Sequence, residues 1–135
     1  MASGVRLIRS GSLSDVAEYA YAATAPAGAR FVFLAGACPL MPDGETAGPG
    51  DVAEQARVCV ANLETALRDS GATLTDVIST RVLVAATSRA DLSTAWRVVR
   101  DAFGSHDVPS TLLGVTVLGY DGQLVELEAV AAIVE

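Results

Sequence analysis

Two amphipathic helical segments stand between β-rich segments, and this order limits the folds open to the chain. In residues 50–71, apolar side chains recur every three or four positions, with Asp51 placed to cap the start and Gly71 to end the helix. Residues 88–104 repeat this pattern and close on a glycine. Because two helices can cover only one face of a sheet, the sequence predicts association with a partner through the other face.

The strands are predicted from runs rich in β-branched and aromatic residues. We expect strands at residues 5–9, 30–36, 76–86, 111–118 and 123–135. The turn GYDG at 119–122 is expected to join the last two strands as a hairpin. The predicted order is β-β-α-β-α-β-β over one domain, residues 1–135. This is an α+β chain whose sheet is covered on one face by two helices.

The composition favours an oligomer and gives no sign of a membrane protein. The 135 residues are 51% hydrophobic, with a mean hydropathy of +0.41. Some of this apolar surplus is expected between subunits. No run of about 18 apolar residues is present, and the first ten residues lack the hydrophobic segment of a signal peptide. A cytoplasmic location is therefore the default expectation.

The charge and the cysteine and histidine content exclude several kinds of site. The net charge is −7 without any Lys/Arg cluster, so nucleic-acid binding is not expected. The cysteines, Cys38 and Cys59, do not form a C-x-x-C motif, and His106 is the single histidine. A His/Cys metal site is therefore not predicted, and no cofactor is indicated.

The last predicted strand carries two carboxylates on one face. Alternation places Glu126 and Glu128 beside each other on the face opposite Leu127. A carboxylate in a buried strand needs a partner. Arg81, in the predicted central strand, can meet either glutamate across the sheet, as an ion pair or as a clamp for a substrate.

Three segments in order resemble the Rid family, also called the YjgF family. FVFLAGACPLMPDGE (31–45) is similar to the family's strand, small-Gly-x-x-Pro and Pro-x-x-Gly-Glu turn. Residues 51–84 keep the family's Gln, Asn-Leu, Gly-Ala and Asp-Val spacing, and VELEAVA (125–131) resembles its closing strand. The resemblance implies a chorismate-mutase-like fold and a homotrimer with a barrel-like centre. It also implies small-molecule clefts between subunits, in which better-known members hydrolyse imines and enamines such as 2-aminoacrylate.

The resemblance also indicates which residues line the cleft. Tyr19, Gly36 and Glu126 match family cleft positions, and Glu126 is the candidate catalytic acid or base. The deaminating members carry an arginine that binds the substrate carboxylate, but here Thr111 stands at that position. Trp96 replaces a frequent Asn, and Ala35 and Ala37 replace Ser and Gln. The candidate substrate-binding residues are Tyr19, Gly36, Ala37, Trp96 and Thr111.

Further candidates and the overall function stay open. Cys38 can be a nucleophile or an inert thiol, and Glu128 and Arg81 can serve a ligand or pair with each other. Glu126 can act on a substrate or be a structural carboxylate. We consider a hydrolase for imine or enamine substrates other than simple imino acids, a non-catalytic binding protein, and a specialised biosynthetic enzyme for a larger, less charged intermediate.

Overall fold

The computed structural model describes residues 3–135. In chain order the elements are β1 (Arg6–Ile8), β2 (Ala22–Thr24), β3 (Arg30–Phe33), α1 (Val52–Asp69), the short 3₁₀ helix η1 (Leu74–Asp76), β4 (Val77–Val84), α2 (Arg89–Phe103), β5 (Ser110–Gly114) and β6 (Val125–Ile133). The predicted helices and the capping role of Asp51, which accepts from the backbone N–H of Glu54, are confirmed.

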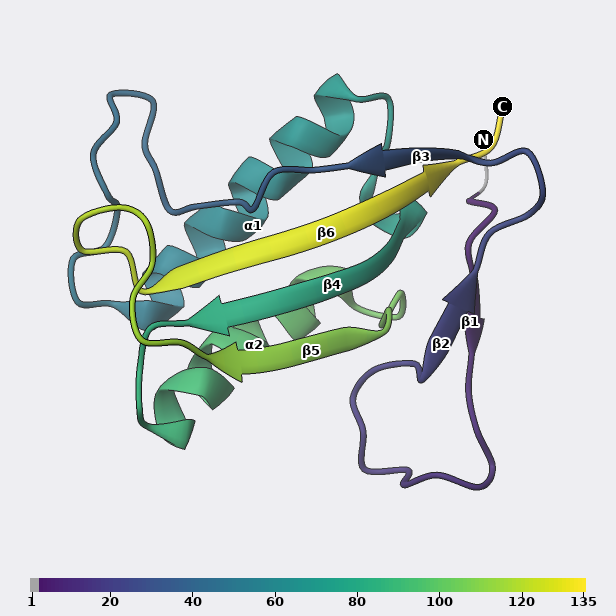
Figure 1. The fold of residues 1–135 in the computed structure, drawn as a ribbon, viewed down its shortest axis with the longest axis horizontal. Helices are drawn as coiled ribbons and strands as arrows, with labels where there is room; N and C mark the ends of the chain where they lie inside the picture. The colour runs from purple at the N-terminus through teal and green to yellow at the C-terminus, as the bar shows by residue number, and fades with distance from the viewer. Residues whose placement is uncertain (1–2) are drawn as a thin grey trace.

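Within the described residues, β3, β6, β4 and β5 form a sheet in that order (Figure 1). β4 runs antiparallel to β6 and parallel to β5. The predicted hairpin between the last two strands is therefore wrong, because β4 lies between them. A strand–helix–strand crossover returns β5 parallel to β4. The GYDG turn instead belongs to a loop that carries the chain past the end of β4, where Ala85 donates to Leu124 at 2.8 Å.

The N-terminal part of the chain forms a separate hairpin. β1 pairs with β2 and not with the main sheet, and β2 adds a strand to the predicted order. The predicted strand at 5–9 is thus present, but its expected place in the main sheet is wrong. Asp107, after α2, holds this hairpin: its carboxylate accepts from Arg9 at 3.0 Å and its carbonyl from the Ala20 N–H at 2.7 Å.

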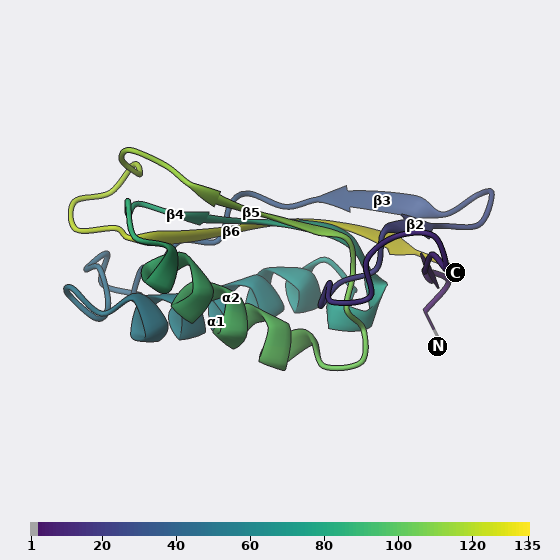
Figure 2. The ribbon, with the colours of Figure 1, turned by 90° about the horizontal axis from the view of Figure 1, so that it is seen from below.

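The core lies between α1, α2 and one face of the sheet (Figure 2). Val125 and Leu127 of β6 and Val82 of β4 are fully buried there. The buried Gln55 is fully bonded, because its amide donates to the Gly48 and Gly122 carbonyls and accepts from the Leu124 N–H. No helix in the described part of the chain is long and apolar enough to cross a membrane.

In the described residues no helix covers the opposite face of the sheet (Figure 2), and large apolar side chains are exposed there. Phe31 is 54% exposed and Phe33 is 80% exposed. Register places Phe33 beside Val130, on the face of β6 that also carries Glu126 and Glu128. We call this the open face.

Candidate functional site

Glu126 lies on the open face of β6, across from Leu83 of β4. Its carboxylate accepts from the Cys38 thiol at 3.2 Å and from the Gln123 amide at 3.3 Å. Cys38 belongs to the loop after β3, which the Ala37–Leu127 bridge holds against β6. The loop and the strand thus bring two predicted site segments, 36–38 and 126, into contact.

Gly36 permits this contact. A Cβ at position 36 would lie 2.5 Å from the Glu126 Oε2 and 2.7 Å from its Cδ, closer than side-chain atoms can approach. Glycine at this position therefore lets the carboxylate lie where it does, and an added Cβ would displace it. The backbone of Ala37 is held against β6. Its N–H donates to the Leu127 carbonyl at 2.7 Å, and its carbonyl accepts from the Leu127 N–H at 2.9 Å.

Cys38 is a poor candidate for a nucleophile. Burial, together with the neighbouring Glu126 carboxylate, raises the pKa of the Cys38 thiol to about 11. The thiolate is the reactive form, so this thiol is nearly all protonated at neutral pH. In this site Cys38 acts as a hydrogen-bond donor to Glu126. Cys59 is buried in the core, and burial raises its pKa further.

Tyr19, Trp96 and Thr111 meet at a second place, on the β5 side of the sheet. With Ser110 and Leu112 they line a hollow of about 460 Å³. The Tyr19 and Trp96 rings lie edge to face, with centroids 6.1 Å apart. We call this the Thr111 hollow. Two aromatic rings, three hydroxyls and a leucine suit an uncharged or aromatic group better than a carboxylate.

The cation predicted for the glutamates is Arg81, and it pairs with Glu128. Thr111, Arg81 and Glu128 lie side by side on β5, β4 and β6. The Arg81 Nη1 is 3.2 Å from the Glu128 Oε1. Arg81 lies next to Thr111 but its charge is already matched. The two partners also border a hollow of about 250 Å³ on the open face, next to Phe33.

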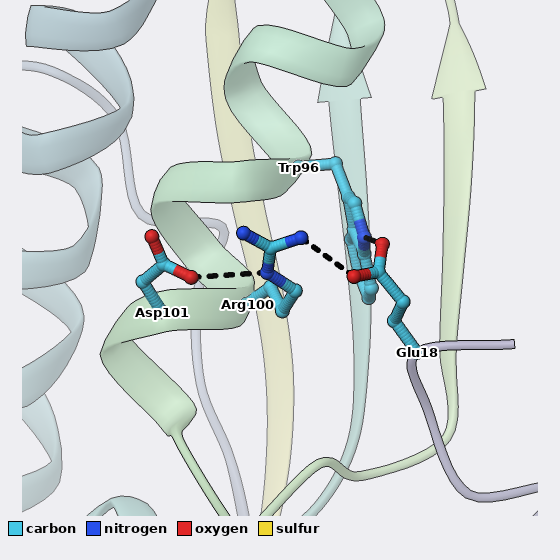
Figure 3. A network of polar contacts seen from close by, with 4 residues as sticks. All are labelled: Glu18, Trp96, Arg100 and Asp101. Atoms are coloured by element: carbon cyan, nitrogen blue, oxygen red, sulfur yellow. Dashed lines mark hydrogen bonds and ion pairs between the residues drawn. The ribbon is translucent and has the colours of Figure 1, made fainter.

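Glu18 and Arg100, which lie beside Trp96, were not among the residues predicted from the sequence. The Glu18 carboxylate accepts from the Trp96 Nε1 at 3.1 Å and from the Arg100 Nη1 at 2.6 Å (Figure 3). Asp101 binds the same guanidinium at 3.0 Å. Trp96 and Arg100 are four residues apart on α2 and therefore lie on one side of the helix. This spacing could have indicated from the sequence that Arg100 is a neighbour of Trp96. Their partner Glu18 comes from a loop of irregular sequence.

Within one chain, the two clusters do not share a cavity. Glu126 and Thr111 lie on β6 and β5 with β4 between them, and are offset by two residues along the strands. The spacing of strands puts their backbones roughly 12 Å apart. Among residues 3–135 no group of His, Cys, Asp and Glu is arranged to hold a metal ion.

Comparison with known proteins identifies the relatives of this arrangement. Residues 12–133 match the family model described as Endoribonuclease L-PSP. The chain belongs to this L-PSP family, also called Rid or YjgF. A RutC family protein of Pyrococcus abyssi is 31% identical over 102 residues, which are 76% of this chain and 78% of that protein.

Solved structures of the Rid family share the fold. YyfB of Yersinia pestis, a Rid-family protein of unknown function, has a TM-score of 0.89 at 27% identity, over 96% of this chain and 99% of that one. Rv2704 of Mycobacterium tuberculosis, a member of the YjgF/YER057c/UK114 family, has a TM-score of 0.65 at 32% identity with the same coverage. These likenesses confirm the α+β fold with its mixed sheet.

Proposed function

We propose that this Rid-family protein is a homotrimer with a chorismate-mutase-like, barrel-like centre, and that it hydrolyses an imine or enamine other than a simple imino acid. The observation that carries the trimer is the apolar open face, with Phe33 80% exposed. Exposed apolar surface of this kind favours burial against further copies of the chain. In such a trimer, a cleft between neighbours joins the Thr111 hollow of one subunit to Glu126 of the next.

Glu126 is the proposed acid and base. Its carboxylate takes a proton from a water molecule that attacks the imine carbon, and the C=N electron pair moves to nitrogen. That proton passes to the nitrogen and gives a carbinolamine. Glu126 then takes the hydroxyl proton and delivers it to the nitrogen as the C–N bond breaks, so a carbonyl compound and ammonia leave. Gly36, Cys38 and Gln123 fix the position of the carboxylate for this step.

The proposed substrate lacks a carboxylate next to the imine. Thr111 offers a hydroxyl but no charge, and the nearby Arg81 and Arg100 are paired with Glu128 and with Glu18 and Asp101. E. coli TdcF, which was solved with bound serine, shares the fold with a TM-score of 0.67 at 24% identity. That complex supports a small-molecule site in this fold. A larger intermediate of a biosynthetic route suits the Tyr19 and Trp96 rings.

A second candidate is a binding protein without catalysis. It is favoured by the bonding of Glu126, whose partners in the described residues are a thiol and an amide and include no cation. We do not propose a ribonuclease activity, although the family description includes that word. The net charge of −7 disfavours binding of the RNA phosphate backbone.

Ammonia release from two substrates tests the proposal. We expect hydrolysis of an uncharged aryl imine such as benzophenone imine, and hydrolysis of 2-aminoacrylate about thirty- to several-thousand-fold below that of arginine-bearing relatives. Glu126→Gln should lower activity about 10²-fold or more, and the control Glu128→Gln much less. Full activity of Glu126→Gln would contradict catalysis by Glu126, and rapid turnover of 2-aminoacrylate would contradict the substrate class.

A further inference from the structure

Arg100 lies next to the Thr111 hollow but is shielded from it. Trp96 and Ser110 line that hollow, and the same two residues line a cavity of about 10 Å³ together with Arg100 and Glu18. The indole thus forms a wall shared by the two spaces. Beyond this wall is a guanidinium, the group that best recognises a carboxylate.

Glu18 bonds both the Trp96 indole that forms this wall and the Arg100 guanidinium behind it. One carboxylate oxygen accepts from the Trp96 indole and the other from Arg100, so a single side chain fixes both (Figure 3). The bond to Arg100, and next the bond to Trp96, lower the pKa of Glu18, which is therefore ionised at neutral pH. The next residue, Tyr19, packs edge to face against the indole.

We infer that Glu18 is a specificity-determining residue of the Thr111 hollow. Its carboxylate already binds Arg100, and its bond to Trp96 keeps the indole between Arg100 and the hollow. The hollow therefore prefers ligands without a carboxylate. The inference rests on the proposed function in treating the Thr111 hollow as a ligand site. It adds the residue that enforces the substrate class, and it predicts that removing this residue opens a carboxylate site.

The test compares benzoate with benzamide, which have nearly the same shape and differ in charge. Trp96 is the only tryptophan of the chain, so its fluorescence reports directly on the hollow. We expect the wild-type protein to bind benzamide in preference to benzoate. Glu18→Ala should bind benzoate about tenfold more tightly than the wild type, while benzamide affinity changes about twofold or less.

Three further variants make the result specific. Glu18→Gln keeps an acceptor for the indole and should give a smaller gain than Glu18→Ala. Asp101→Asn removes the other carboxylate beside Arg100 without touching Trp96, and should give no gain. Glu18→Ala combined with Arg100→Gln should lose the gain. Circular dichroism and the mass in solution confirm that each variant is folded and assembled.

Two results would overturn the inference. One is an unchanged benzoate affinity in folded Glu18→Ala, and the other is an equal gain in Asp101→Asn, which would reflect net charge alone. The proposed function fails separately. If aryl imines are not hydrolysed but Glu18→Ala still gains benzoate binding through Arg100, the role of Glu18 stands and the hydrolase assignment falls.

Discussion

Arg81 pairs with Glu128, at 3.2 Å, and leaves Glu126 to a thiol and an amide. The sheet register decides this, because Arg81 lies directly across from Glu128 while Glu126 faces Leu83. Two glutamates on the same face of one strand therefore have different surroundings. Glu128 has its charge matched by a cation, and Glu126 has no cation partner among the described residues.

The Arg81–Glu128 pair should matter to assembly more than to the fold of one chain. Both side chains are well exposed in the isolated chain, at 55% and 39%, and a trimer would cover them. Arg81→Gln alone leaves an unmatched carboxylate in that interface, so dissociation on dilution should occur at higher concentration. Adding Glu128→Gln should restore much of the loss, because removing both charges leaves none unpaired. Sedimentation of the single and double variants checks this, and equal dissociation of all forms would contradict it.

Gly36→Ala should damage the site with little effect elsewhere. The added Cβ would meet the Glu126 carboxylate at 2.5 Å and push it from Cys38 and Gln123. We expect activity on an aryl imine to fall at least tenfold, about 1.4 kcal/mol in the barrier. Gly119→Ala is the control, because a Cβ there meets nothing within 4 Å. Equal activities of the two variants would show that the position of Glu126 is not critical.

Cys38 should resist alkylation near pH 8. Burial first, and Glu126 second, raise its thiol pKa to about 11, so the thiolate fraction is small until the pH approaches that value. Iodoacetamide labelling with mass spectrometry should give a rate at least about tenfold below that of the unfolded chain. In Glu126→Gln the Cys38 pKa should decrease but remain raised, because burial is the larger cause. Rapid labelling of the native wild type at pH 8 would refute this environment.

The Arg9–Asp107 pair should stabilise the N-terminal hairpin at neutral pH and lose this effect in acid. The hydrogen bond from Arg9 lowers the pKa of Asp107 below its ordinary value of 3.8. A lowered folded pKa gives stability that is present above 3.8 and is lost as the pH falls through the folded pKa. Asp107→Asn should therefore lower the free energy of unfolding by about 1 kcal/mol or less at pH 7, and by less at pH 3. Urea unfolding at both pH values, with Asp69→Asn as control, measures the difference.

Local patterns were sufficient for the helices and the faces of β6, but not for the strand order. The periodicity of α1 and the Asp51 cap are local, and alternation in β6 correctly separated Glu126 from the buried Leu127. The hairpin predicted from the GYDG turn was wrong, because these residues favour a tight turn whether or not the flanking strands pair with each other. Whether β5 pairs with β6 or with β4 depends on the crossover through α2, which no local pattern encodes.

The same distinction applies to the candidate site. Gly36, Cys38 and Glu126 lie together in the chain, and Tyr19, Trp96 and Thr111 lie together at a second place. The family resemblance implied one cleft between subunits lined by Tyr19, Gly36 and Glu126, and that cleft stays a prediction. The bond between Glu18 and Arg100 could not be predicted, because it joins residues 82 positions apart and depends on how the loop before β2 packs against α2. Whether these residues act on a ligand stays a prediction.

The mass of the protein in solution tests the central claim most directly, because the shared cleft exists only in the assembly. Sedimentation equilibrium at micromolar concentration should give about three times the 13.8 kDa chain mass. A trimeric mass is the result expected if the open face, with Phe33 and Glu126, is buried against a neighbouring subunit. A stable monomer of 13.8 kDa would contradict the trimer and the cleft that joins Thr111 of one subunit to Glu126 of the next.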